Sequence, residues 1–500
     1  MTRQIRRVAA AMFVLFAALF INLNYLQVIQ AESLAQDTRN SRGLVREYAT
    51  RRGPIIAQGP PAQGQAAEVQ IARVEETDGR LRFLRRYDRG PLYAHVTGFH
   101  SVVYGRTELE ESFNEYLVGS APETFARNLG DLLAGRERQG DTVITTLRQP
   151  VQEAAQQALG ELRGAVVALD PGTGDILALY SSPSYDPNEL SSHDVAAVQA
   201  AYERLNADPA GPLRNRAVRE TYPPGSTFKV ITAAAALESG LSPDEAFPDP
   251  RTYDVPQTTA DIGNFGGGLC NGGNPLTLTR ALEVSCNTTF ADLGVRLGAD
   301  ALIAQAEAFG FNKEFDFGLP RLEPSRIPKE LDVPSTAQSA IGQRDVRATP
   351  LQMAMVAGAI AFDGVLMSPR IVTQVEDVAG RIIRQFPPEP LRLTGRNDAQ
   401  AVSSQTAATL TDMMVGVVER GSGTRAQIPG VRVAGKTGTA EVGGDRQPTV
   451  WFIGFAPADQ PRIAVAVVIE DGGGVGDEAT GGRLAAPVAR QVMDAALAAG

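Results

Sequence analysis

Lysine, histidine, cysteine and tryptophan are scarce in this chain of 500 residues. Among 47 lysine and arginine residues only four are lysines, and the chain has three histidines, two cysteines and one tryptophan. Because the chain has no C-x-x-C, H-E-x-x-H or Walker-type sequence, we expect no metal ion, nucleotide or other cofactor. The net charge of −10, without a basic stripe interleaved with aromatic residues, argues against a nucleic-acid-binding protein.

The few histidines and lysines also limit the catalytic chemistry of the chain. His95 and His100 lie in the N-terminal part and His193 lies in a polar segment, so we interpret them as surface or structural residues rather than as part of a Ser-His-Asp triad. Lysine, unlike arginine, can lose its proton when it is buried and then act as a general base. Each lysine is therefore a candidate functional residue: Lys229, Lys313, Lys329 and Lys436.

One long apolar run stands at the N-terminus. Val8 to Leu26 contains no charged residue over 19 positions, and three arginines precede it. This length nearly spans a lipid bilayer, and the flanking arginines favour a cytoplasmic N-terminus. We expect a cytoplasmic tail over residues 1–7, a single transmembrane helix over residues 8–28 and a body outside the cytoplasmic membrane. A signal peptide cleaved near Ala31 or Ser33 is the alternative.

An extracytoplasmic body affects the interpretation of the two cysteines. Cys270 and Cys286 are sixteen positions apart, and disulfides persist outside the cytoplasm. A bridge that closes this loop would contribute about 3 kcal/mol to stability in the chain-entropy description. We favour this disulfide over the alternative of two free, partly buried thiols.

Turn residues and apolar runs divide the remaining chain into two parts. Residues 36–145 predict a small α+β module, in which residues 53–65 form a loop with adjacent prolines and residues 104–119 contain a short helix. Residues 146–500 predict a larger domain. It opens with a hairpin over residues 164–182, where two apolar runs flank the turn sequence Asp-Pro-Gly-Thr-Gly.

The larger domain combines one antiparallel sheet with many helices, so the expected fold class is α+β. Together with the hairpin, three later strands predict a five-stranded sheet flanked by helices at both ends of the domain. These strands are expected over residues 431–441, 449–456 and 462–470, and the flanking helices over residues 151–162 and 485–499. An inserted all-helical part is expected from alanine-rich segments over residues 228–237, 279–297, 300–309, 350–361 and 404–419. Glycine-rich residues 248–276 predict a long loop beside a cleft.

One short stretch joins a serine to one of the rare lysines. The Pro-Pro-Gly sequence before Ser226 cannot lie inside a helix, so Ser226 is predicted at a helix N-terminus, where free N–H groups favour developing negative charge. Lys229 lies one turn later on the same face and can take the serine proton if burial keeps the amine neutral. S-x-x-K alone is a weak motif, and the alternative is that Ser226 only caps the helix.

A second rare lysine stands in a K-T-G motif. Lys436, Thr437, Gly438 and Thr439 lie on a predicted strand. The lysine and the hydroxyl groups can hold a substrate carboxylate, and the glycine can leave room for substrate backbone. The alternative is an exposed lysine on a hairpin strand.

Ser285 and Asn287 form an S-x-N sequence between these two motifs. The same pattern recurs at Ser112 and Asn114, so it is poor evidence alone. Only the later copy lies between S-x-x-K and K-T-G, on a helical stretch that could fold over the cleft.

The order S-x-x-K, S-x-N, K-T-G resembles the penicillin-recognising serine acyltransferases, and in particular the class B penicillin-binding proteins. Similar segments occur in both parts of the chain, and the likeness covers nearly all of it. They are Arg52–Ile55, Gly105–Gly119, Ser181–Asn188, Ile341–Gln343, Thr349–Ala354 and Trp451–Pro457. Ser285-Cys286-Asn287 is similar to the penicillin-binding proteins A of actinobacteria. One departure is Ala57, where the family's first motif usually carries aspartate; it affects the N-terminal module and not the cleft.

The resemblance implies a serine β-lactamase/transpeptidase-like domain over residues 146–500 and a pedestal or dimerisation module over residues 36–145. It also implies a peptidoglycan D,D-transpeptidase that cross-links stem peptides during growth or division and is inhibited by β-lactams. Ser226 would be the nucleophile, Lys229 its base and Ser285 the proton relay. The substrate would be held by Asn287 at its amide and by Lys436, Thr437 and Thr439 at its carboxylate, beside Gly438. The backbone N–H groups of Ser226 and Thr439 would form the oxyanion hole.

The resemblance implies partners as well: peptidoglycan stem peptides, β-lactam antibiotics, the cytoplasmic membrane, a membrane glycosyltransferase and other cell-wall synthesis or division proteins. Three alternatives use the same features. A D,D-carboxypeptidase would transfer the acyl group to water, and a β-lactamase would need a base that activates a deacylating water. A scaffold would bind or activate a glycosyltransferase, with the cleft secondary.

Overall fold

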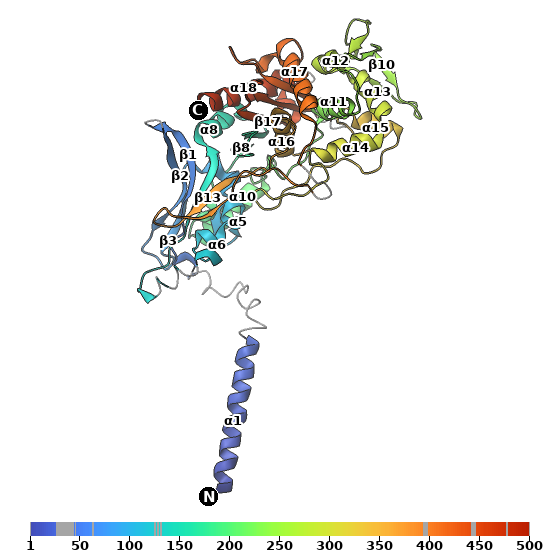
Figure 1. Cartoon of the computed structure of the whole chain (residues 1–500). Helices are drawn as coiled ribbons and strands as arrows, with labels where there is room; N and C mark the ends of the chain where they lie inside the picture. The colour runs from blue at the N-terminus through green and yellow to red at the C-terminus, as the bar shows by residue number, and fades with distance from the viewer. Residues whose placement is uncertain are drawn as a thin grey trace.

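The computed structural model describes residues 2–26, 45, 47–62, 65–124, 127, 130, 133–393, 399–441, 447–476 and 479–499. Helix α1 (Thr2–Asn24) extends away from a body with two parts, a lower one and an upper one (Figure 1). Within α1, the apolar stretch Arg3–Asn24 is not buried against the rest of the protein. The expected N-terminal apolar helix is therefore present and is long enough to cross a membrane. Residues 27 and 28 of the expected span, and the alternative cleavage positions Ala31 and Ser33, lie outside the described residues.

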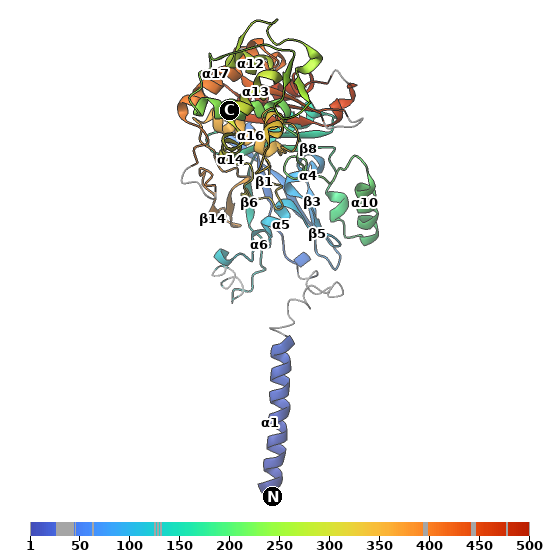
Figure 2. The same cartoon turned by 90° about the vertical axis from the view of Figure 1, so that its right-hand side faces the viewer.

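The lower part, called the pedestal below, is built on a six-stranded sheet in the order β14-β13-β6-β1-β2-β3. Its strands are β1 (Ile55–Ala62), β2 (Gln65–Glu76), β3 (Phe83–Tyr87), β6 (Thr142–Arg148), β13 (Val372–Glu376) and β14 (Ile382–Gln385). Strand β13 pairs antiparallel with β6, so the sheet joins segments that are far apart in the sequence. In Figure 2, β14 lies at one side of the pedestal, and α9 (Asn188–Ser191) and α10 (Val195–Ala207) lie toward the other.

The expectation of a loop over residues 53–65 is wrong, because most of this segment is strand β1. Ile55 and Ile56 are buried, and β1 pairs with β2 antiparallel and with β6 parallel. The adjacent prolines stand where the β1–β2 register shifts, between Gln58 and Pro61. Proline has no N–H for the ladder, so a register irregularity accommodates it. Burial of the isoleucines in the centre of the sheet outweighs the local turn signal.

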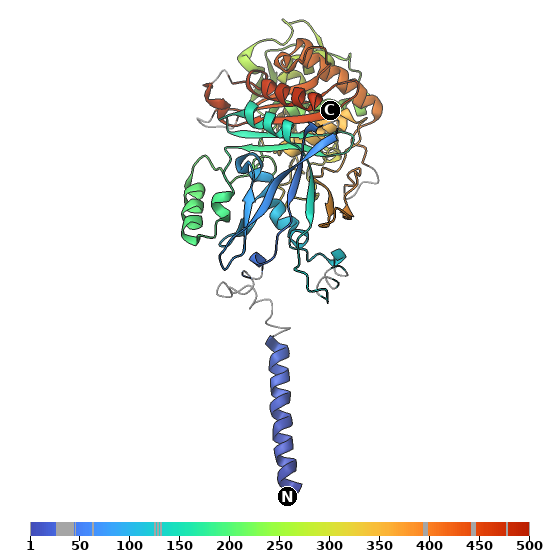
Figure 3. The same cartoon turned by 90° about the vertical axis from the view of Figure 1, so that its left-hand side faces the viewer.

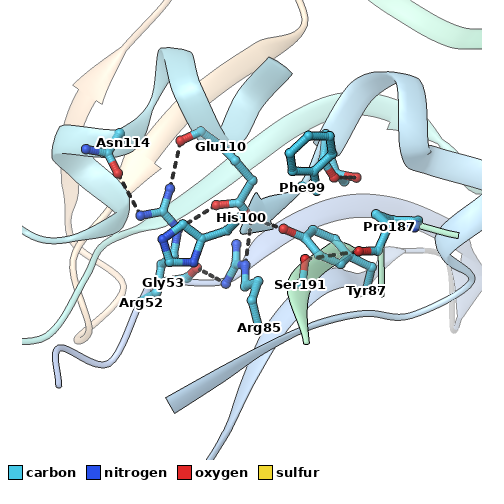
Figure 4. Close-up of polar contacts among 12 residues, drawn as sticks. Arg52, Gly53, Arg85, Tyr87, Phe99, His100, Glu110, Asn114, Pro187 and Ser191 are labelled. Atoms are coloured by element: carbon cyan, nitrogen blue, oxygen red, sulfur yellow. Dashed lines mark hydrogen bonds and ion pairs between the residues drawn. The ribbon is translucent and has the colours of Figure 1, made fainter. Parts of the chain in front are cut away.

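Short helices accompany this sheet, and one buried ionic cluster ties them to it. The elements are α4 (Gly90–Thr97), β4 (His100–Ser101), β5 (Gly105–Arg106), α5 (Glu108–Ser112), α6 (Asn114–Leu117) and η2 (Pro122–Thr124). Glu110 on α5 accepts hydrogen bonds from Arg52 Nε (2.5 Å), Arg85 Nε (2.6 Å) and the Tyr87 hydroxyl (3.2 Å) (Figure 4). Burial raises the pKa of Glu110, but the guanidinium groups of Arg52 and Arg85 outweigh it and hold the pKa at about 2.

The upper part contains the five-stranded antiparallel sheet that the sequence predicts, in the order β15-β16-β17-β7-β8. Its strands are β7 (Gly164–Leu169), β8 (Ile176–Ser182), β15 (Ala434–Ala440), β16 (Thr449–Ala456) and β17 (Ile463–Ile469). Alternate strand residues contribute to two cores, because helices cover both faces. Helices α8 (Gln149–Leu159) and α18 (Gly481–Ala498) pack on one face and α16 (Pro350–Ala361) on the other. In Figure 3, α18 lies along the sheet, near the label of the C-terminus.

An all-helical part lies beside this sheet, as expected. Its helices are α11 (Lys229–Glu238), α12 (Leu278–Val284), α13 (Asn287–Leu297), α14 (Ala299–Ala308), α15 (Val333–Ser339) and α17 (Ser404–Arg420). The expectation of one continuous helix over residues 279–297 is wrong, because Ser285 has a φ of 64° and separates α12 from α13. The glycine-rich segment expected as a long loop contains a small hairpin of β10 (Thr252–Asp254) and β11 (Asp261–Gly263). Strands β9 (Ala246–Phe247) and β12 (Leu276–Thr277) pair at its base.

Candidate active site

Ser226 lies in η3 (Gly225–Phe228), a short helical turn that leads directly into α11. Gly225 has a φ of 52°, and a Cβ atom at this position would lie 2.6 Å from the carbonyl oxygen of Thr439. Only glycine adopts this backbone readily and leaves space for the neighbouring strand. The serine is thereby held beside β15, the edge strand that carries the K-T-G motif.

Lys229 begins α11, and its side chain is fully buried. Its Nζ donates to the carbonyl oxygen of Ser285 (2.7 Å), to Asn287 Oδ1 (2.7 Å) and to Ser285 Oγ (3.3 Å). No hydrogen bond joins the side chains of Lys229 and Ser226, both of which the structure describes. The amine of the first motif is therefore anchored to the S-x-N turn.

Ser285 Oγ lies between two lysines. Lys436 Nζ donates to Ser285 Oγ (2.9 Å) and to the carbonyl oxygen of Thr437 (3.0 Å). The left-handed backbone of Ser285 breaks the helix here, so that its hydroxyl faces both amines. Side chains from all three sequence motifs thus meet at one hydroxyl group.

The two amines are electrostatically unusual. Burial lowers the pKa of Lys436 to about 7, and burial together with the charge of Lys436 lowers the pKa of Lys229 well below its usual 10.5. Among the residues that the structure describes, no carboxylate forms a salt bridge with either amine. Burial and the nearby charge both favour the neutral form of the Lys229 amine over its charged form.

The turn between α12 and α13 is held by a residue from the glycine-rich loop. Asn264 Oδ1 accepts the backbone N–H groups of Asn287 (3.0 Å) and Thr288 (3.1 Å), and Asn287 Nδ2 donates to the carbonyl oxygen of Gly263 (2.9 Å). Asn264 thus caps the N-terminus of α13, where Cys286 provides no side-chain cap. The sequence did not indicate this residue, because a cap that comes from a distant loop leaves no local pattern.

A disulfide between Cys270 and Cys286 fastens the same loop to the S-x-N turn. Nearby, the carboxylate of Asp249 accepts the backbone N–H groups of Cys270 (2.8 Å), Asn271 (2.7 Å) and Gly273 (2.9 Å). The loop is therefore stabilised by a covalent bond and by charge-assisted hydrogen bonds at the edge of the site.

The motifs border one open cavity of about 950 Å³. Its wall includes both serines, the amide and the threonine hydroxyls: Ser226, Ser285, Asn287, Thr437 and Thr439. Lys229 and Lys436 lie beneath this wall rather than in it. Gly438 also lies behind it, since a Cβ atom there would meet the carbonyl oxygen of Pro224 at 2.9 Å. A side chain at Gly438 would therefore collide with the turn before Ser226 rather than extend into the cavity.

The glycine-rich segment lies beside the cavity as expected, and it contributes Phe265 and Leu269 to the wall. Other parts of the wall were not indicated by the sequence: Ser422 from the segment after α17, and Gly481 and Gly482 from the start of α18. They come together only through the tertiary fold.

The other candidate residues lie away from the cavity. Asn114, in the second S-x-N copy, accepts a hydrogen bond from Arg52 (2.7 Å) in the pedestal, and Lys313 pairs with Glu307 (3.2 Å). None of the three histidines contributes to the cavity wall. His95, for example, is buried against the carbonyl oxygen of Pro212 at 2.9 Å.

Comparison with known proteins agrees with this geometry. Residues 164–494 match the family described as penicillin binding protein transpeptidase domain, and residues 52–143 match the penicillin binding protein A dimerisation domain. The chain is 44% identical to the peptidoglycan D,D-transpeptidase PbpA of Mycolicibacterium smegmatis, with 100% of each chain covered. It is 42% identical to the protein of the same name from Mycobacterium tuberculosis, with 99% of each covered.

Solved structures give the same result. The structure is similar to penicillin-binding protein A from M. tuberculosis in its ceftriaxone acyl-enzyme complex, with a TM-score of 0.83 and 43% identity over 91% of this chain and 100% of that one. The penicillin G acyl-enzyme complex of that protein gives a TM-score of 0.82 and 43% identity, over 90% of this chain and 100% of that one. From its motifs, its sheet topology and these similarities, the chain belongs to the class B penicillin-binding proteins.

Proposed function

We propose that Ser226, Lys229 and Ser285 carry the chemistry of a peptidoglycan D,D-transpeptidase in this chain. The chain is a serine acyltransferase that cross-links stem peptides in cell-wall synthesis and is inhibited by β-lactams. One observation supports the assignment of residues above all: Ser285 Oγ is within hydrogen-bond reach of both buried amines, and it opens onto the same cavity as Ser226.

In the first step, Ser226 Oγ attacks the carbonyl carbon of the penultimate D-alanine, and Lys229 accepts the proton of its hydroxyl. A neutral lysine amine has two N–H donors and one lone pair. In the neutral amine, the two 2.7 Å acceptors, Ser285 O and Asn287 Oδ1, satisfy both donors. The longer 3.3 Å contact with Ser285 Oγ is then not a donation from the amine, and the lone pair is left for a hydroxyl proton. The hydrogen bond between Ser226 and Lys229 would then form when substrate is bound, as catalytic hydrogen bonds often do.

Ser285 relays the proton to the nitrogen of the leaving D-alanine. The peptide bond breaks, the acyl group stays on Ser226 as an ester, and D-alanine leaves as a neutral amine that takes the relayed proton. Lys436 lies on the other side of the relay and stabilises negative charge on Ser285 Oγ. The amine of a second stem peptide then attacks the ester, which forms the cross-link and frees Ser226.

Asn287 and β15 orient the substrate. Asn287 Nδ2 donates one hydrogen to Gly263 and has a second for the substrate amide, while Thr437 and Thr439 face the cavity and can bind the terminal carboxylate. The backbone N–H groups of Ser226 and Thr439 form the oxyanion hole, and each donor contributes about 3 kcal/mol in comparable enzymes. β-Lactams acylate the same serine.

Product analysis tests this assignment against the carboxypeptidase and β-lactamase alternatives. Purified protein is incubated with a pentapeptide donor and an amine acceptor, and separately with benzylpenicillin. We expect a cross-linked product and a slowly released penicilloyl adduct. A dominant tetrapeptide product would favour a carboxypeptidase, and rapid hydrolysis of penicillin would favour a β-lactamase. Normal growth of a Ser226→Ala strain would favour the non-catalytic scaffold.

We also propose the orientation of the chain in the cytoplasmic membrane. Arg3, Arg6 and Arg7 favour a cytoplasmic start of α1, which places the cavity outside. In that position the pedestal can contact a membrane glycosyltransferase and other cell-wall or division proteins. In intact cells, a membrane-impermeant maleimide should label an Asn206→Cys variant and leave Gln4→Cys unlabelled; the reverse pattern would invert the topology.

A further inference from the structure

Ser422 is a cavity residue outside the three motifs. It follows α17, where the chain turns toward η5 (Thr424–Ala426). Its Oγ atom lies 2.6 Å from Thr437 Oγ1, and both residues line the cavity. The hydroxyl of the K-T-G motif therefore has a second hydroxyl as its direct partner.

The backbone at Ser422 is held from two sides. Its N–H donates to the carbonyl oxygen of Glu283 (3.0 Å), two residues before Ser285, and a Cβ atom on Gly482 would lie 2.3 Å from the carbonyl oxygen of Ser422. The Glu283 carboxylate is buried and pairs with Arg280 (2.9 Å) and Arg420. Ser422 is thus held between α12 and α18 before any ligand binds, which lowers the entropic cost of binding.

Hydroxyl groups, rather than cations, form this side of the cavity. Lys436 points beneath the wall toward Ser285 Oγ and the carbonyl oxygen of Thr437, so its amine is engaged there. Ser422, Thr437 and Thr439 each bring an O–H donor to the wall. A carboxylate has two oxygens with about four acceptor sites, so one or two hydroxyls cannot satisfy it. The first residues of α18 line the same cavity, and a helix N-terminus favours negative charge.

We infer that Ser422 is a specificity-determining residue that binds, together with Thr437 and Thr439, the terminal carboxylate of the acyl donor. The inference rests on the proposed function, in which this carboxylate belongs to the leaving D-alanine. In the free site, one of the hydroxyls of Ser422 and Thr437 donates to the other. When the donor binds, both O–H groups turn to the carboxylate, and the negative charge of the ligand replaces a neutral acceptor.

Paired substrates test this role directly. One acyl donor is an N-acyl-D-alanyl thioester of thioglycolic acid, which carries a carboxylate; the other is the thioester of thioglycolamide, which does not. Thiol release gives kcat/KM for wild type, Ser422→Ala, Ser422→Thr and the control Ser404→Ala, an exposed serine at the opposite end of α17. For Ser422→Ala we expect kcat/KM to fall at least about tenfold with the acid and less than about twofold with the amide. Ser422→Thr and Ser404→Ala should keep the preference for the acid.

The other outcomes are distinct. If Ser422→Ala lowers kcat/KM equally with both donors, the inference is overturned, because Ser422 would then only shape the cleft. The inference is also overturned if the wild type shows no preference for the acid donor over the amide donor. Absence of acyl-enzyme with either donor in wild type and Ser404→Ala would refute the proposed function itself. If Ser422→Ala is unstable, the ratio of kcat/KM with the acid donor to kcat/KM with the amide donor still tests the inference, because this ratio does not depend on the amount of folded protein. Ser422→Thr, which retains a hydroxyl, should keep the wild-type ratio.

Discussion

Replacement of Asn264 by alanine should slow acylation more than it destabilises the fold. The change removes the acceptor of two backbone N–H groups, those of Asn287 and Thr288, at the start of α13. Loss of such a cap costs about 1 kcal/mol of stability, which lowers the melting temperature of a domain of this size by about 1–2 °C. Asn287 then loses its fixed position relative to Lys229 and Gly263, and we expect the acylation rate constant to fall about fivefold to tenfold.

The assay is stopped-flow acylation by a fluorescent penicillin, combined with thermal unfolding. Asn271→Ala is the matched control, since Asn271 lies in the same loop and its side chain donates to the carbonyl oxygens of Asn274 and Pro275 rather than to the start of α13. Asn264→Asp keeps an oxygen acceptor and should recover much of the rate. If Asn264→Ala melts early but acylates like the wild type, Asn264 caps the helix without positioning Asn287, and the reasoning fails.

Three further predictions concern charge and cross-linking. Glu110→Gln should destabilise the pedestal by about 3–5 kcal/mol, because it leaves Arg52 and Arg85 buried without their counter-ion. The pKa of Glu110 in the folded protein, about 2, lies below its usual 4.5, so the stability that its charge contributes is complete above pH 4.5 and is lost toward pH 2. Denaturant unfolding should therefore show a smaller difference in free energy between wild type and Glu110→Gln at pH 3 than at pH 7. An equal difference at both pH values would contradict this. Lys436→Met should move the acid limb of the pH–acylation profile of the residual activity to higher pH, since the charge of Lys436 lowers the pKa of Lys229; an unmoved limb would exclude Lys229 as the base. Cys270→Ser combined with Cys286→Ser should lower the free energy of unfolding by about 3 kcal/mol in guanidinium titrations, and unchanged stability would show that the bridge contributes nothing.

Local sequence patterns were sufficient for the framework of the upper part. The hairpin around Asp-Pro-Gly-Thr-Gly and the three C-terminal apolar runs predict the five strands, because short apolar runs bounded by turn residues are short-range signals. The rare lysines indicated the motifs that meet at Ser285. In the pedestal, strand β1 was missed because its prolines suggest a loop, whereas pairing with two distant strands decides its conformation.

Contacts between distant segments explain what the sequence did not indicate. The helical composition of residues 279–297 predicts one helix, but the turn at Ser285 is held by Lys229, Lys436 and the cap from Asn264. Ser422 has no motif of its own, and its partner Thr437 becomes apparent only when α17 and β15 are packed together. Site residues are therefore harder to predict from the sequence when they lie on segments outside those that carry the motifs.

The central claim, that Ser226 is a slowly deacylating nucleophile, is tested most directly by intact-protein mass spectrometry after incubation with benzylpenicillin. Wild type should carry one stable penicilloyl adduct that persists for hours, and Ser226→Ala should carry none although it remains folded. An adduct of the same mass and lifetime on folded Ser226→Ala, or no adduct on folded wild type, would contradict the account.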